Sequence, residues 1–151
     1  MIEFITHSKS LATTVARAEV FAKTDLPCLI AGGVGVGKRH LARYIHEAGP
    51  RRGSSFVVLD ISTAQNIEKE IFGEMKRSLL LGDNLAAGAI ARAENGTLLI
   101  KDVHLLPQPL QTQLSATIQL GGYKPVKGSA SLSSNCRYLF SYPFDEKKLG
   151  G

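Results

Sequence analysis

One stretch of this sequence decides the fold, and it reads Ala31-Gly32-Gly33-Val34-Gly35-Val36-Gly37-Lys38-Arg39-His40. The apolar run 27–31 leads into it, and the helical pattern 41–46 follows it. The chain therefore passes from a strand through a glycine-rich loop into a helix, with the spacing G-x-x-x-x-G-K from Gly32 to Lys38. This spacing, in this context, is typical of a loop that holds phosphate groups.

The residues of this loop suit an anionic ligand. Glycines allow successive backbone N–H groups to face one anion, the helix N-terminus adds partial positive charge, and Lys38 adds a full charge. We therefore predict that a nucleoside triphosphate binds at Gly32, Gly33, Val34, Gly35, Val36, Gly37, Lys38 and Arg39. Arg39 stands where this motif usually has a Ser or Thr whose hydroxyl binds Mg²⁺. The alternative is a glycine-rich turn that binds no ligand.

Length and composition indicate a single globular domain. The chain has 151 residues, of which 44% are hydrophobic and 21% are charged, which are ordinary values for such a domain. It has no apolar run near the roughly 20 residues of a membrane span and no signal-peptide pattern, so we expect a cytoplasmic protein without a membrane partner. Its two cysteines, Cys28 and Cys136, lie in apolar runs, which predicts buried free thiols in a reducing compartment.

The charged residues exclude some classes of function. A net charge of +5 permits an anionic partner, but the basic residues are scattered, so we predict no DNA-reading module and no direct DNA contact. The four histidines, at positions 7, 40, 46 and 104, are spread along the chain, and no metal site is predicted.

Apolar periodicity predicts alternating strands and helices. Strands are expected over residues 27–31, 56–61, 97–102 and 136–141, and helices over residues 8–23, 38–48, 66–72, 86–94 and 107–120. The remaining segment 73–88 is expected to be mainly irregular, and residues 121–128 to form a small hairpin. This alternation predicts an α/β fold with a mostly parallel sheet.

Further blocks of the sequence follow one another in a recognisable order. They are ITHS at residues 5–8, GGVGVGKR at 32–39, ARYIH at 42–46, FVVLDI at 56–61, EKEIFG at 68–73, AENGTLLIKDV at 93–103 and LPQPLQTQL at 106–114. In this order the blocks resemble the AAA+ sigma-54 interaction domain of bacterial enhancer-binding proteins, the NtrC-like response regulators. The resemblance covers nearly the whole chain.

The resemblance implies a three-layer α/β P-loop NTPase domain, the nucleotide-binding subdomain of an AAA+ module without its helical lid. Residues 1–151 are then a single domain, expected to be a fragment of a longer transcription regulator that forms ring-shaped homo-oligomers. In the family a fifth parallel strand would follow the point where this chain ends. We therefore expect the strand 27–31 to lie at or near an open sheet edge, which invites pairing with another chain.

Several functional positions of the family are changed in this sequence. Lys101 replaces the metal-side Asp, Asp102 replaces the neighbouring Glu that polarises the attacking water, and Asp60 replaces the Asn that restrains that Glu. Arg77-Ser78-Leu79-Leu80-Leu81-Gly82 stands in place of the G-A-F-T-G-A loop that contacts sigma-54, and Tyr142-Pro143 in place of a polar sensor. The chain ends before the family's arginine fingers and lid.

These changes predict weak binding of ATP or ADP without Mg²⁺, and no useful hydrolysis. Phosphoryl transfer depends on positioning and on Mg²⁺, and Lys101 brings a cation where the family has a carboxylate. Asp102 is one methylene shorter than Glu, and a misplacement of about 1 Å can cost on the order of 100-fold in rate. We therefore assign no catalytic residue, and expect Asp102 to pair with Lys38 or Lys101.

Two other features have alternative interpretations. Lys101 is either a solvated lysine at a strand end or an occupant of the vacated metal position, whereas Asp60 is expected to be a polar residue at a strand end. The leucines of the segment 79–81 form either a collapsed loop or an exposed docking surface.

The function hypothesis is a regulatory domain of a two-component response regulator, which acts by oligomerisation or by nucleotide-sensitive docking. One alternative is an active ATPase that remodels the sigma-54 RNA polymerase holoenzyme. Another is an interaction scaffold without nucleotide. Sigma-54 is a partner only through the resemblance, because the contact loop is replaced.

Overall fold

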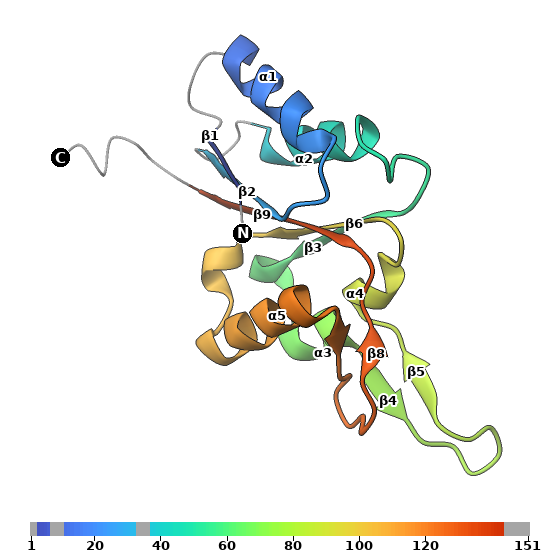
Figure 1. Ribbon diagram of the computed structural model, residues 1–151. Coiled ribbons are helices and arrows are strands. Elements are labelled where there is room, and N and C mark those ends of the chain that lie inside the picture. Colours follow the sequence, from blue (N-terminus) through green and yellow to red (C-terminus); the bar gives the residue numbers. More distant parts are fainter. Residues whose placement is uncertain (1–2, 7–10, 33–36, 144–151) are drawn as a thin grey trace.

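A parallel sheet of five strands forms the centre of the protein (Figure 1). The computed structural model describes residues 3–6, 11–32 and 37–143. In sheet order the strands are β1 (Glu3–Thr6), β2 (Cys28–Gly32), β9 (Arg137–Pro143), β6 (Thr97–Lys101) and β3 (Phe56–Asp60). All four neighbouring pairs are parallel. The predicted α/β fold with a parallel sheet is therefore confirmed.

Helices cover both faces of this sheet and make three layers (Figure 1). On one face lie α1 (Leu11–Ala22) and α2 (Lys38–Glu47). On the other lie α3 (Ile67–Phe72), α4 (Ala89–Arg92) and α5 (Gln108–Leu120). Short 3₁₀ helices, η1 (Ile61–Thr63) and η2 (Val103–Leu105), follow β3 and β6.

Successive residues of the central strands enter different cores, because side chains along a strand alternate between faces. Leu99 and Leu139 pack in the core under α1 and α2, whereas Leu98, Ile100 and Phe140 pack in the core under α3 to α5. This double burial explains why these strands read as continuous apolar runs. Both cysteines, expected to be buried thiols, are buried, and neither forms a disulfide within the described residues.

Strand 27–31 was expected at or near an open sheet edge, and β2 is the second strand from the edge, covered by β1. β2 is an interior strand, because Glu3–Thr6 pairs in parallel with residues 28–31 on the side opposite β9. No strand was predicted for these first residues. The edges of the sheet are instead β1 and β3.

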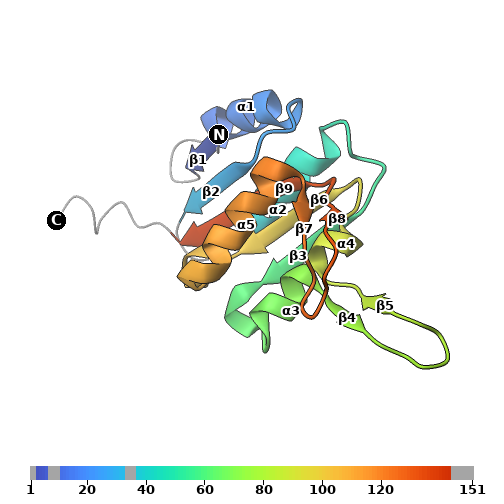
Figure 2. The same ribbon diagram turned by 60° about the horizontal axis from the view of Figure 1, so that its bottom comes forward.

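The segment 73–88, expected to be irregular, contains an antiparallel hairpin of β4 (Glu74–Lys76) and β5 (Asn84–Ala86). Figures 1 and 2 both show it projecting away from the body of the protein. Its base is held by close backbone packing, since a Cβ on Gly88 would lie 2.4 Å from the backbone nitrogen of Gly73. Only glycine fits there.

The remaining boundaries differ in detail. The hairpin expected over 121–128 is a longer ribbon, in which β7 (Gly122–Tyr123) pairs with β8 (Leu132–Ser133). The helix expected over 86–94 is shorter, and the helix expected over 8–23 spans Leu11–Ala22. Ser8 and Ser10, either of which could cap this helix, lie outside the described residues. Within the described ranges, no helix has the length and apolar character needed to span a bilayer.

Candidate functional site

The carboxyl ends of the parallel strands bring the predicted site residues to one edge of the sheet. Gly32 at the end of β2 lies opposite Pro143 of β9, Ser141 of β9 lies opposite Lys101 of β6, and Lys101 lies opposite Asp60 of β3. Ligands of open α/β sheets bind at this edge. The structure therefore gathers residues that are far apart in the sequence.

The glycine loop is described at its two ends, because residues 33–36 lie outside the described part of the chain. Gly37 caps the N-terminus of α2 with φ 79° and ψ 32°, a left-handed conformation that favours glycine. The first turn of α2 contains no acidic residue, so its partial positive charge is not offset there. This end of α2 has the form expected for an anion site.

Lys38, the first residue of α2, reaches back to the last residue of β2. Its Nζ donates a hydrogen bond to the carbonyl oxygen of Gly32, at 3.0 Å. Burial lowers the pKa of Lys38, the charge of Asp102 opposes that effect, and the charge of Lys101 adds to it. Lys38, Lys101 and Asp102 therefore belong to one electrostatic site.

Lys101 forms an ion pair with Asp60, with 3.6 Å between Nζ and Oδ2. The other carboxylate oxygen of Asp60 accepts hydrogen bonds from the Ser62 backbone nitrogen, at 3.0 Å, and the Ser62 hydroxyl, at 2.6 Å. The bond from the Ser62 hydroxyl is the main cause that lowers the pKa of Asp60, and Lys101 lowers it further. Asp102 was expected to pair with Lys38 or Lys101. Lys101 instead forms its ion pair with the strand-end residue Asp60, and the charge of Asp102 acts on Lys38.

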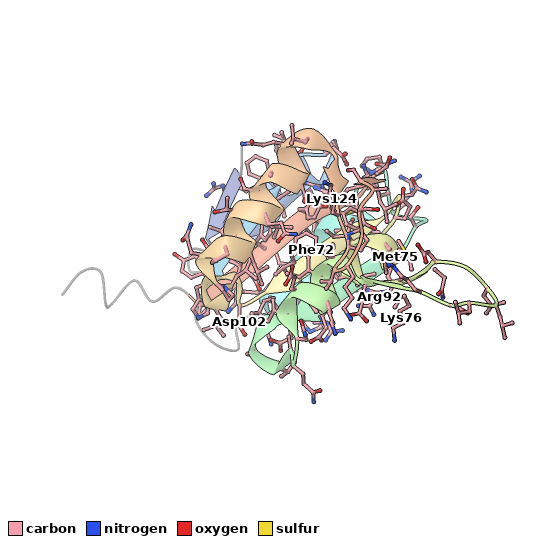
Figure 3. All side chains as sticks on the ribbon, turned by 90° about the horizontal axis from the view of Figure 1, so that it is seen from below. Phe72, Met75, Lys76, Arg92, Asp102 and Lys124 are labelled. Carbon is pink, nitrogen blue, oxygen red and sulfur yellow. The ribbon has the colours of Figure 1, made fainter. Side chains whose placement is uncertain are left out.

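Asp102 follows β6 in a left-handed conformation, with φ 60° and ψ 47°. Few residues other than glycine adopt this region, although Asp tolerates it. Such conformations gather at functional sites. Asp102 acts on Lys38 through its charge. Figure 3 places Asp102 on the opposite side of the protein from Met75 and Lys76 at the base of the hairpin.

Tyr142 and Pro143, expected in place of the family's polar sensor, lie at the end of β9. The Tyr142 ring lies 6.3 Å from the ring of His104, and Pro143 has no backbone N–H to donate. Sequence reasoning missed Ser141, one residue earlier, which is buried. The signal was a serine that follows the apolar residues Leu139 and Phe140, close to the carboxyl end of the strand and beside the predicted site.

The segment 77–82, expected in place of the G-A-F-T-G-A loop, forms the tip of the β4–β5 hairpin. Leu79, Leu80 and Leu81 are 106%, 95% and 84% exposed, so the collapsed-loop interpretation was wrong. Backbone hydrogen bonds between Ser78 and Gly82 close the turn, and the Ser78 hydroxyl accepts from the backbone nitrogens of Leu80 and Leu81. An ordered turn therefore holds the leucines in solvent.

The positively charged groups of the site are arranged to attract an anion. The N-terminus of α2, Lys38 and Lys101 all present positive charge to it, and this fits an anion. The carboxylate of Asp60 is already engaged by Ser62 and Lys101. Across residues 3–6, 11–32 and 37–143, no group of three or more His, Cys, Asp or Glu side chains is placed to hold a metal ion.

A parallel α/β sheet with a glycine-rich loop between its second strand and a helix N-terminus defines the P-loop class of domains. Within this class, the family model described as the sigma-54 interaction domain matches residues 4–148. The chain belongs to the sigma-54 interaction domain family.

Curated relatives of the chain are transcriptional regulators. The DNA-binding transcriptional regulator NtrC of Rhizobium meliloti (strain 1021) is 32% identical over 128 residues, which cover 83% of this chain and 26% of the relative. The transcriptional regulatory protein GlrR of Escherichia coli (strain K12) is 28% identical over 137 residues, covering 89% of this chain and 31% of the relative. The chain therefore spans about a quarter to a third of the length of these regulators.

The fold also matches solved structures. A crystal structure of NtrX from Brucella abortus superposes with a TM-score of 0.78 at 26% identity, covering 93% of this chain and 32% of that one. A structure of the same protein in complex with ATP superposes with a TM-score of 0.77 at 25% identity, covering 94% and 31%. The three-layer P-loop NTPase fold is thereby confirmed.

Proposed function

We propose that this chain is a nucleotide-binding regulatory domain of a bacterial transcription regulator. It binds ATP or ADP weakly through residues 32–39, without Mg²⁺, and it hydrolyses ATP at no useful rate. The matched family and the regulators among its relatives support the regulatory role. The ATP and ADP complexes of the similar NtrX protein support the ligand.

The ion pair between Lys101 and Asp60 carries this proposal. In the family, the position of Lys101 holds a carboxylate on the metal side of the site. Here it holds an ammonium group, and the carboxylate nearest to it on the next strand is committed to that ammonium group and to Ser62. A divalent cation bound beside Lys38 and Lys101 meets repulsion from both, whereas a phosphate meets attraction.

The wider assignments are part of the same proposal. Residues 1–151 form a single domain of a longer, cytoplasmic, two-component response regulator, and copies of the domain form a homo-oligomer. Contact with sigma-54 is lost or weakened, because the leucine-containing turn replaces the family's contact loop. The domain makes no direct contact with DNA, and it has no membrane partner.

Titration with a fluorescent ATP analogue, with magnesium or with a chelator, tests the proposal. We expect the same affinity in both conditions, and loss of binding in Lys38→Ala. The matched control is Lys124→Ala, which removes an exposed lysine that lies away from Asp102 (Figure 3). It should bind as the unmodified protein does.

Other results would favour the alternatives. Magnesium-dependent release of phosphate that Lys38→Ala abolishes would identify an active ATPase. A complete lack of binding would identify a scaffold without nucleotide, for which the Lys38–Gly32 hydrogen bond is the resting arrangement of the loop. The double variant Lys101→Asp, Asp102→Glu returns the family's carboxylates, so its affinity should become magnesium-dependent if charge at position 101 excludes the metal.

A further inference from the structure

Ser141 carries a buried hydroxyl for which the described residues provide no hydrogen-bond partner. The residue is 1% exposed, and its Oγ meets no donor or acceptor in the described part of the chain. Native proteins pair nearly all buried polar groups, because an unpaired one costs free energy of folding. An unpaired hydroxyl beside a candidate ligand site is explained if the ligand supplies the partner.

The direction of the Ser141 side chain follows from strand alternation. Leu139 of β9 packs in the core under α1 and α2, and Phe140 packs in the opposite core. Ser141 therefore faces the side of the sheet that α2 covers. Lys101 faces the same side, because it lies two residues after Leu99 of the same core.

The strand pairing places Ser141 close to the end of β2, where the glycine loop that leads to α2 begins. Ser141 lies between Ile30 of β2 and Lys101 of β6. Two residues beyond Ile30, the carbonyl oxygen of Gly32 accepts the hydrogen bond from Lys38. The hydroxyl is thus flanked by the strand that leads into the glycine loop and by the strand that ends in the second cation of the site.

We propose that Ser141 is a nucleotide-binding residue whose hydroxyl donates a hydrogen bond, directly or through one ordered water, to a phosphate oxygen of the bound nucleotide. This inference rests on the proposed function. Pro143 faces the same side but has no donor, and Tyr142 faces the other side, where it lies near His104. Ser141 is therefore the side-chain donor that the carboxyl end of β9 supplies toward α2, and it lies two residues before the end of the strand.

A ligand role and a purely structural role predict opposite effects of Ser141→Ala. A structural hydroxyl contributes to folding, so its removal lowers the melting temperature and leaves nucleotide affinity alone. A buried hydroxyl whose partner is a ligand is unpaired in the free protein and costs free energy of folding. Its removal therefore leaves the melting temperature unchanged or raises it. Nucleotide affinity then falls.

Thr97→Val is the matched control. Thr97 lies on the neighbouring strand β6 and faces the same core, it is 0% exposed, and its hydroxyl is hydrogen-bonded to Nδ1 of His46 at 2.7 Å. It lies at the opposite end of the strand from Lys101. This variant should lose melting temperature and keep its affinity for ATP.

Both variants and the unmodified protein are compared by thermal unfolding without ligand and by titration with the fluorescent ATP analogue. We expect Ser141→Ala to bind about tenfold more weakly, as for loss of one hydrogen bond to a charged group, with no fall in melting temperature. Unchanged affinity in Ser141→Ala, while the unmodified protein binds, overturns this inference and leaves the proposed function standing. Absence of binding by the unmodified protein overturns both.

Discussion

At the scale of single residues, His46 joins three separate parts of the chain. On α2, its Nδ1 accepts from the hydroxyl of Thr97, at 2.7 Å, and its Nε2 donates to the carbonyl oxygen of Ser54, at 3.1 Å. The carbonyl oxygen only accepts, so the proton of the neutral ring is assigned to Nε2. His46 is 4% exposed, and burial is the main cause that lowers its pKa.

This arrangement predicts acid sensitivity of the fold. Because the pKa of His46 is lower in the folded protein than in the unfolded chain, the unfolded chain binds the proton first. The free energy of unfolding should therefore fall as the pH drops below about 6.5, the ordinary value for histidine. Urea unfolding between neutral and mildly acidic pH measures this slope. His46→Gln should flatten it, and an unchanged slope in that variant would contradict the assignment.

At the scale of elements, Arg137 of β9 holds the C-terminal end of α1. Its guanidinium donates to the carbonyl oxygens of Phe21 at 2.6 Å, Leu26 at 3.1 Å and Ala22 at 3.3 Å. The last turn of α1 has no basic residue of its own, so this distant arginine satisfies carbonyls that the helix leaves open. The contact fixes α1 against the sheet and so supports the face on which α2 and the loop lie.

Arg137→Met should destabilise the protein by about 3 kcal/mol, because it removes the three hydrogen bonds of a buried guanidinium and takes the donor from the Ala22 carbonyl oxygen. Urea unfolding measures the change. Arg43→Met is the control, since Arg43 forms an ion pair with Glu47 whose side chains are 59% and 60% exposed; it should cost less than about 1 kcal/mol. Equal losses in the two variants would show that the buried hydrogen bonds of Arg137 add little.

The turn at the tip of the hairpin behaves as a separate element. Its backbone is closed by Ser78 and Gly82, and the leucines of 79–81 make no contribution to either core. Changing the three leucines to serine should therefore alter the free energy of unfolding by less than about 0.5 kcal/mol per residue. Binding of an apolar dye should fall, because an exposed apolar patch is removed. A large loss of stability would mean that the leucines pack against the body in solution.

At the scale of the whole molecule, the central parallel sheet could be predicted from the sequence, because a strand that is buried on both faces has apolar residues at most of its positions. Residues 97–101 and 137–141 were found in this way. β1 was missed because a four-residue strand carries no pattern of its own, and only its pairing with β2 defines it. The hairpin was missed because backbone packing of Gly73 and Gly88 holds its base, not apolar periodicity.

The candidate site was predictable to the extent that motif positions identify it. The spacing from Gly32 to Lys38 located the loop. Comparison with the family pattern identified the substitutions at positions 60, 101 and 102. The partner of Lys101 was not, because the pairing of β3 with β6 decides which carboxylate lies beside it. Whether the Ser141 hydroxyl has a hydrogen-bond partner among the described residues depends on the packing around it, so the sequence alone does not predict that it has none.

The pairing of β1 with β2 has a consequence for assembly. Without Glu3–Thr6, the N–H and C=O groups of β2 on that side would form an open edge, and open edges pair with other chains. Deletion of residues 1–6 should lower the free energy of unfolding and raise the average mass seen by light scattering as concentration increases. Deleting residues 146–151, beyond the end of β9, is the comparison and should have a smaller effect on both. If the first deletion leaves stability and mass unchanged, β1 adds no protection to β2, and any homo-oligomer must form through another surface.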